Sequence, residues 1–197
     1  MADHPLASWL SNYVNYYQQQ ANQLPLHFHF DETSPAQVSK INDMLCHWQP
    51  HLKTPIEDFA DIGRGLELDI HPNLALIYGS YYGGPLYFDS QFGKGHLLQV
   101  WNDEDLIFLK ENLISHGLMK TKLKQPVTFF VGTLDNGDEN IVIDNHNGYF
   151  YLEVPGQEPH QLLAENVPQL LAQISPRLVL EQQFEQQLEQ PPQANMG

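Results

Sequence analysis

The sequence is poor in basic residues, with 9 Lys and Arg against 24 Asp and Glu and a formal net charge of −15 at pH 7. A surface of this sign repels phosphate backbones and anionic lipid headgroups. Nucleic-acid binding and electrostatic adsorption to a membrane are therefore disfavoured. A basic partner, in contrast, is attracted by such a chain.

Cysteine and long hydrophobic runs are also scarce. Cys46 is the single cysteine, which excludes an intrachain disulfide and a zinc site built on several thiolates. The first residues, 1–5, lack the basic and apolar regions of a signal peptide. The most apolar stretch, Val127–Leu134, is far shorter than the roughly 20 residues of a membrane-spanning helix. We therefore expect a cytoplasmic protein that reaches a membrane only through a partner, without inserting into it.

The apolar content is nevertheless sufficient for a core, because 42% of the 197 residues are hydrophobic and 11% are aromatic. The length is typical of one domain. We predict a single domain over residues 1–178. The Gln-rich remainder, residues 179–197, is predicted to be a frayed helix or disordered.

Helical spacing of apolar residues and helix-start signals predict four helices. They span Pro5–Gln23, Pro55–Ile62, Asn102–Gly117 and Leu162–Ile174. The glycines at 63 and 65 are expected to close the second helix.

Alternating or short apolar runs predict the strands. Four of them span Leu66–Ile70, Leu74–Tyr78, Leu86–Phe88 and His96–Trp101. Three more form an antiparallel meander joined by two Asn-Gly turns: Val127–Leu134, Asn140–Asp144 and Tyr149–Val154. The order of elements predicts an α+β fold.

No pattern of reactive side chains indicates catalysis. His27 and His29 share a strand face near Asp31, but no zinc-ligand spacing accompanies them, and a structural role is favoured. The segment Asp135–Glu139 is read as a hairpin turn because it lacks the order of a calcium loop. No nucleophile elbow or phosphate loop is present in the sequence. We therefore predict a protein that is not an enzyme and uses no cofactor or metal. A metal-dependent hydrolase that uses the histidines remains an alternative.

The charge distribution is uneven. Residues 110–124 hold four lysines and one glutamate, so the rest of the chain is more acidic than the total. Glu57 and Asp61 lie one helical turn apart, and Glu67 and Asp69 would share a strand face. Such clustering suits either a solvated surface that keeps the protein in solution or a concave patch that attracts a basic segment. The partner-binding candidates are Glu57, Asp61, Glu67, Asp69 and Asp89. The carboxylates at 103–105 are set aside because capping of the next helix explains them.

An ordered series of segments carries a family resemblance. It comprises His47–Pro50, Asp69–Pro72, Gln91–Gly93, Leu97–Asp105, Glu111–His116, Leu123–Pro126 and Thr128–Leu134. Across residues 45–178 the chain resembles the Syd family, the SecY-interacting proteins of bacteria within the SUKH superfamily. It departs at Ala36, where the family often has cysteine, and in the Gln-rich extension.

The resemblance implies a compact α+β fold with a curved mixed, largely antiparallel sheet flanked by helices. It also implies a non-catalytic protein on the cytoplasmic side of the bacterial inner membrane. Such a protein binds the basic cytosolic loops of the translocon subunit SecY through an acidic concave surface and monitors SecY assembly. Cytoplasmic loops of membrane proteins are enriched in Lys and Arg, which agrees with this role. The alternative is a SUKH-type immunity protein that neutralises a toxin.

Overall fold

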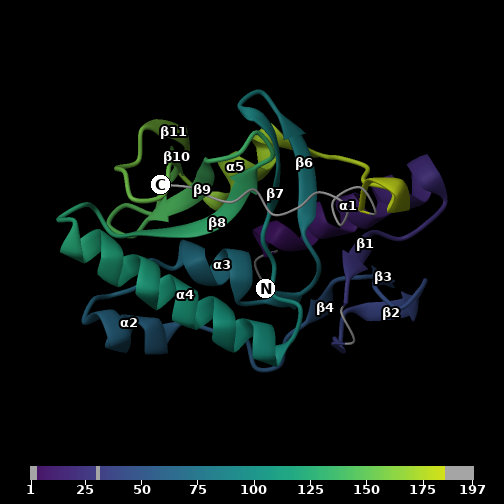
Figure 1. Ribbon diagram of the computed structural model, residues 1–197, viewed down its shortest axis with the longest axis horizontal. Helices are drawn as coiled ribbons and strands as arrows, with labels where there is room; N and C mark the ends of the chain where they lie inside the picture. The colour runs from purple at the N-terminus through teal and green to yellow at the C-terminus, as the bar shows by residue number, and fades with distance from the viewer. Residues whose placement is uncertain (1–3, 30–31, 185–197) are drawn as a thin grey trace.

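The computed structural model describes residues 4–29 and 32–184. Five helices carry labels in Figure 1: α1 (Pro5–Ala21), α2 (Ala60–Leu66), α3 (Asn73–Tyr78), α4 (Asp103–Lys122) and α5 (Val167–Gln173). Residues 181–184 are also helical. The described part of the chain contains no helix that is both long and apolar enough to cross a membrane.

The largest sheet has seven strands in the order β11-β10-β9-β8-β7-β6-β12, and each pairing in it is antiparallel. The strands are β6 (Leu86–Ser90), β7 (Gly93–Leu97), β8 (Thr128–Leu134), β9 (Asn140–Asp144), β10 (Phe150–Glu153), β11 (Gln161–Ala164) and β12 (Ile174–Pro176). The sheet is strongly curved (Figure 1). The predicted α+β class, with a curved and largely antiparallel sheet flanked by helices, is confirmed.

Two smaller sheets lie beside the large one (Figure 1). One has the order β1-β3-β2 and the other pairs β4 with β5. Their strands are β1 (Leu26–Phe28), β2 (Gln37–Lys40), β3 (Leu45–Trp48), β4 (His51–Leu52) and β5 (Tyr81–Tyr82).

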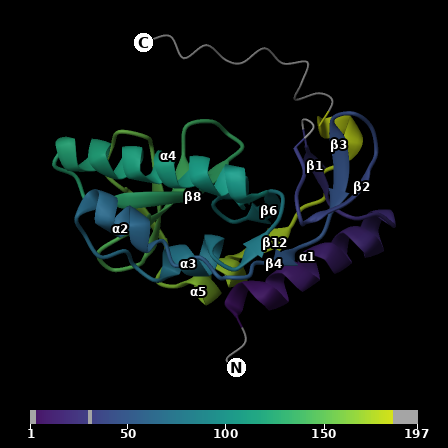
Figure 2. The ribbon, with the colours of Figure 1, turned by 90° about the horizontal axis from the view of Figure 1, so that it is seen from below.

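Helices cover both sides of the curved sheet. In Figure 2, α4 lies on one side of β8, and α1, α3 and α5 lie on the opposite side. Helix α1 turns one apolar stripe inward, because Leu6, Leu10, Tyr13 and Tyr17 are all buried. A large buried aliphatic or aromatic side chain contributes roughly 1.5–3 kcal/mol. This stripe therefore fixes α1 against the core that also contains Trp48.

The predicted meander is confirmed as β8, β9 and β10. Gly137 and Gly148 lie in its two turns with φ of 124° and 77°. These backbone angles favour glycine because it has no Cβ. The side chain of His71 leaves no room for a Cβ at Gly148.

The predicted helix Pro55–Ile62 begins and ends later than expected, at Ala60 and Leu66. The Glu57 carboxylate accepts a hydrogen bond from the Phe59 amide, and Phe59 has a φ of 59°. This local turn occupies the residues after Pro55 and delays the helix. Glu67, with a φ of 55°, ends the helix in place of the two glycines inside it.

The predicted strands Leu66–Ile70 and Leu74–Tyr78 are wrong. The first contains the end of α2 and a connecting segment, and the second is α3. Leu74, Ile77 and Tyr78 are buried at helical spacing. Apolar runs this short do not distinguish a strand from a buried helix.

Three other boundaries are corrected. The strand predicted over His96–Trp101 is β7, which ends at Leu97, and α4 continues past Gly117 to Lys122. The helix predicted over Leu162–Ile174 is shorter because its first residues form β11. The Asn166 side chain accepts a hydrogen bond from Gln169 and caps α5 there.

The described part of the predicted extension packs on the domain. Val179 and Phe184 are buried with Leu26, Leu45 and Tyr87 in a second, smaller apolar cluster. The prediction for the rest of the Gln-rich segment, 185–197, lies outside the described residues.

Candidate partner-binding surface

Glu57 and Asp61 lie side by side where α2 and α4 contact each other; we call this contact line the α2–α4 seam. Lys110, on α4, places its Nζ 2.7 Å from Glu57 Oε2 and 2.8 Å from Asp61 Oδ2. Burial is the largest single effect on the pKa of Asp61 and would raise it. The hydrogen bond and charge of Lys110, together with backbone hydrogen bonds, outweigh burial and hold the pKa below its usual value. Lys110 thus relieves the repulsion that the spacing of the two carboxylates implies.

Glu67 and Asp69 line a surface hollow of about 600 Å³ at the end of α2. Asp58 and Arg64 line the same hollow, and all four side chains belong to exposed residues. Asn145 donates a hydrogen bond of 2.8 Å to the Asp69 backbone carbonyl, which leaves the Asp69 carboxylate available. The predicted pair thus lies in one concavity, but on a helix end and a connecting segment, not on a strand.

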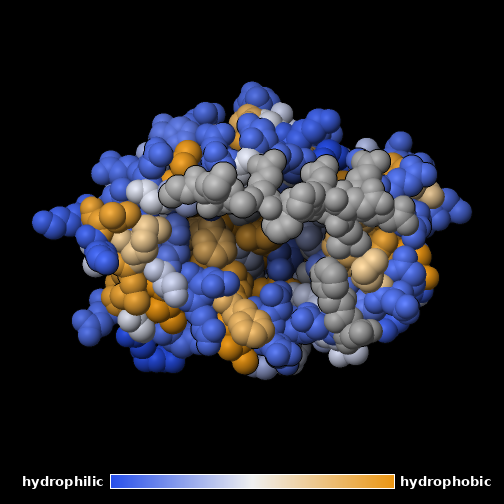
Figure 3. Space-filling view, in the orientation of Figure 1, coloured by the Kyte–Doolittle hydropathy of each residue, from blue (hydrophilic) through white to orange (hydrophobic). Residues whose placement is uncertain are grey.

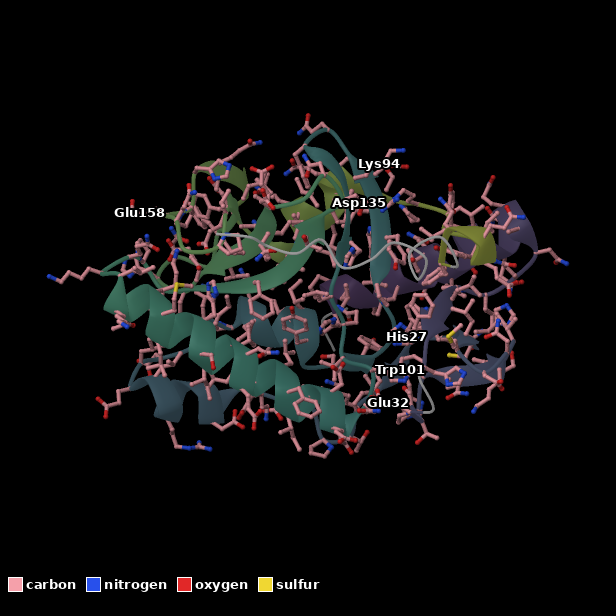
Figure 4. All side chains as sticks on the ribbon, in the orientation of Figure 1. His27, Glu32, Lys94, Trp101, Asp135 and Glu158 are labelled. Carbon is pink, nitrogen blue, oxygen red and sulfur yellow. The ribbon has the colours of Figure 1, made fainter. Side chains whose placement is uncertain are left out.

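Asp89 lies apart from the other four candidates. It is on β6, and its Oδ1 is 3.9 Å from Nζ of Lys94 across the β6–β7 hairpin. Figure 4 shows Lys94 at the top of the molecule, whereas α2 lies at the bottom in the same orientation in Figure 1. The structure brings Glu57 and Asp61 together and Glu67 and Asp69 together, and it separates Asp89 from both pairs.

Lys53 and Tyr82 extend the charged seam toward the start of α4, and neither was predicted as a site residue. The Lys53 side chain is almost fully buried, and it donates a 2.9 Å hydrogen bond to the Tyr78 carbonyl. Its Nζ lies 4.7 Å from the centre of the Tyr82 ring, and the Tyr82 hydroxyl donates to Asp103. Burial lowers the pKa of Lys53 to about 8, against the attraction of Glu57 and other nearby carboxylates.

The carboxylates at the start of α4 do not all serve as caps. Asn102 accepts a 2.9 Å hydrogen bond from the Asp105 amide, and Asp105 accepts one of 2.8 Å from the Trp101 amide. This reciprocal arrangement is similar to a capping box, with Asp105 bonded to the amide one residue before the N-cap. Asp103 and Glu104 are exposed and take no part in it. Helix capping therefore explains Asp105, whereas the other two carboxylates, which their position alone suggested were caps, lie on the surface.

The lysines of segment 110–124 give less surface charge than their number suggests. Lys110 is held by Glu57 and Asp61, and Lys120 is fully buried against Glu153. These contacts also occupy Glu57, Asp61 and Glu153, so they remove the local basic charge of the segment without making the rest of the surface more acidic.

Within residues 4–29 and 32–184, no group of three or more His, Cys, Asp or Glu side chains is placed to hold a metal ion. The ring of His27 lies 4.2 Å from that of Trp101 between centres, tilted by 48° (both labelled in Figure 4). Burial lowers the pKa of His27 to about 4. His29 has a ring nitrogen 3.2 Å from the Asn42 carbonyl. Both histidines thus contact neighbouring segments of the protein, His27 through Trp101 and His29 through Asn42.

Fold and surface together define an acidic α+β domain with exposed carboxylates grouped along the α2–α4 seam. Residues 3–176 match the family model described as Syd protein (SUKH-2). A relative named Protein Syd from Shewanella loihica is 36% identical over 180 residues, covering 88% of this chain and 82% of the relative. Another Protein Syd, from Shewanella baltica strain OS223, is 38% identical over 176 residues with the same coverage of each chain. The chain belongs to the Syd family.

Proposed function

We propose that this protein binds the basic cytosolic loops of SecY and monitors SecY assembly, without catalysis, on the cytoplasmic side of the bacterial inner membrane. Membership of the Syd family supports this partner. The net charge of −15 supports the chemistry, because cytoplasmic loops of membrane proteins are rich in Lys and Arg. No observation on the described residues favours the immunity-protein alternative.

The observation that carries the proposal is the grouping of exposed carboxylates around α2. Glu67 and Asp69 lie in one hollow, and Asp61, whose side chain is 43% exposed, borders the seam. Among the described residues, Glu67 and Asp69 form no ion pair, whereas Glu57 and Asp61 are paired with Lys110. Exposed charge pairs contribute up to about 1 kcal/mol each, so several must act together. Long-range attraction chiefly raises the association rate.

The test is the joint change Glu67→Lys and Asp69→Lys. We expect weaker binding to SecY-containing membrane vesicles at low salt, because two attractive charges become repulsive. The difference should shrink at high salt, since exposed charges are screened over about 8 Å at physiological ionic strength. Binding is measured by co-sedimentation, with vesicles lacking SecY as the blank.

Asp89→Lys is the matched control, because Asp89 is exposed but lies on the distant β6–β7 hairpin. Asp89→Lys changes the net charge by half as much as the double change does. If its loss of binding free energy is also at least half as large, net charge and not the α2 surface determines affinity. If the folded double variant binds as tightly as the wild type, Glu67 and Asp69 do not contact the partner.

A further inference from the structure

Helix α4 exposes two large apolar side chains that the charge-based function does not use. Ile107 is 58% exposed and Phe108 is 55% exposed. Figure 3 shows hydrophobic surface over the front of α4 with hydrophilic surface around it. Adjacent apolar side chains exposed to this degree on a helix indicate a contact surface more readily than scattered single residues do.

Carboxylates border these two side chains along the helix. Glu104 lies one turn before Phe108, and Glu111 lies one turn after Ile107; both glutamates are exposed. No described residue forms an ion pair with either carboxylate. Residues three and four apart are neighbours on a helix face, so the four side chains form one patch. We call Glu104, Ile107, Phe108 and Glu111 the α4 patch.

The negative charge of the α4 patch indicates which kind of partner can bind to it. A second copy of this chain would bring the same unpaired glutamates against each other, and like charges oppose that contact. An anionic membrane would be repelled in the same way. A protein segment with an apolar side chain between two basic ones matches both the apolar centre and the acidic ends.

The spacing of the glutamates sets the register of that segment. Glu104 and Glu111 are seven residues apart, which is about 10 Å along a helix axis. A partner helix spans this distance between positions i and i+7, which lie on one helix face. On an extended strand, positions i and i+4 lie on one face about 13 Å apart, which long Lys side chains can adjust to the glutamates.

We propose that the α4 patch binds a basic amphipathic segment with two Lys or Arg about 10 Å apart and a bulky apolar residue between them. The inference rests on the proposed function, because it names the kind of segment that the acidic surface recognises. It adds an apolar anchor to a contact otherwise made of charges. Truncating such an anchor typically weakens binding more than removing a charge at the rim.

The test uses the full chain and labelled peptides in fluorescence anisotropy. One peptide carries Lys at i and i+7 with Leu at i+3 and i+4, for a helix. A second carries Lys at i and i+4 with Leu at i+2, for an extended strand. Each has its own scrambled control of the same composition. We expect one ordered peptide to bind more tightly than its scramble. The variant Ile107→Gln/Phe108→Gln should then bind it about tenfold more weakly, from the loss of part of two apolar side chains. The variant Glu104→Gln/Glu111→Gln should bind less tightly at low salt and lose most of its salt dependence.

Leu118→Gln is the matched control, since Leu118 is 54% exposed on the same helix but outside the α4 patch. Circular dichroism melting confirms that each variant is folded. The proposal is overturned if neither ordered peptide binds better than its scramble, or if Leu118→Gln weakens binding equally. It is also overturned if Ile107→Gln/Phe108→Gln abolishes only self-association in sedimentation or only adsorption to zwitterionic vesicles.

Failure of this inference is distinguishable from failure of the SecY proposal. If SecY vesicles bind Ile107→Gln/Phe108→Gln normally but reject Glu67→Lys/Asp69→Lys, the α4 patch is not the anchor and the proposed function stands. If the peptides bind in register but SecY vesicles do not bind the wild type, the α4 patch stands and the partner is a different basic protein.

Discussion

Lys120 is a fully buried ammonium held by a network of polar groups under α4. Its Nζ lies 2.9 Å from Glu153 Oε2 and donates a 2.7 Å hydrogen bond to the Gln157 carbonyl. Thr128 donates to the same carboxylate oxygen at 2.8 Å. His116 places Nε2 3.4 Å from the other oxygen. Two charges so far from water are tolerated only because each is paired and hydrogen-bonded.

Replacing Lys120 with methionine should destabilise the protein strongly. The change keeps the volume of the side chain but leaves the buried Glu153 carboxylate without its cation. We expect a loss of about 3–5 kcal/mol in the free energy of unfolding at neutral pH. Urea denaturation followed by tryptophan fluorescence measures it. The double variant Lys120→Met/Glu153→Met should recover part of this loss, and a double variant no more stable than the single one would contradict the charge argument.

The pH dependence provides an independent check of the same pair. Burial would raise the pKa of Glu153, but the nearby His116 and the hydrogen bonds from Lys120 and Thr128 together outweigh burial and lower it. In the wild type the pair therefore stabilises the fold fully above the unfolded pKa of about 4.3 and loses this effect as the pH falls through the lower folded value. In Lys120→Met, the hydrogen bond and charge of Lys120 no longer oppose burial, so the pKa of Glu153 should rise above its value in the wild type. The stability gap between the two proteins should consequently narrow as the pH is lowered.

At the scale of the element, α4 illustrates a helix whose start is fixed by a single side chain. Asn102 caps the helix and also donates a 2.9 Å hydrogen bond to the Thr33 carbonyl, which ties α4 to the loop after β1. The helix places both the Lys110 ion pairs and the α4 patch. Its N-terminus therefore helps to position Lys110 and the α4 patch.

Asn102→Ala should cost about 1 kcal/mol in unfolding free energy, because the Asp105 amide loses its partner at the helix start. Thermal or urea unfolding measures the change. Asn102→Asp is the control, since aspartate also caps well and adds a charge at the positive end of the helix dipole. Equal losses in the two variants would show that the bond to Thr33, and not the cap, is what matters.

The sequence patterns correctly predicted those helices and strands whose ends are set by residues close in sequence, such as caps and turns. The cap at Asn102 and the Asn-Gly turns gave α4 and the β8–β10 meander nearly as the structure has them. The residues from Leu66 to Tyr78 were misassigned, because packing between distant segments determines their conformation. Leu66 lies so close to Gly117 on α4 that a Cβ there would be 2.7 Å from it. No local pattern contains that contact.

At the scale of the whole molecule, the same limit applies to the candidate site. The clustering of Glu57 with Asp61, and of Glu67 with Asp69, was readable from the sequence. Their pairing with Lys110 was not, because Lys110 is 53 and 49 positions away from the two carboxylates that it binds. The separation of Asp89 likewise depends on where β6 lies in the sheet.

The C-terminal boundary of the domain can be tested by truncation. The predicted boundary follows residue 178, yet the Val179 amide donates a 3.1 Å hydrogen bond to the Tyr17 hydroxyl. Phe184 places its ring 5.0 Å from Phe28 and 5.9 Å from Tyr87, between ring centres. A chain ending at residue 178 lacks all three contacts, whereas a chain ending at 184 keeps them.

We expect the chain ending at 178 to be about 2 kcal/mol less stable than the chain ending at 184. This is less than the loss of unfolding free energy when a core Phe is replaced by Ala, because a terminal helix can detach without unfolding the domain. Urea unfolding of the two chains beside the full chain measures this, and Phe184→Ala in the full chain isolates the aromatic contribution. Equal stability of the two truncated chains would place the boundary at 178. A loss reproduced by Phe184→Ala alone would instead assign residues 179–184 to the folded domain, because one buried ring would then account for the anchoring of the segment.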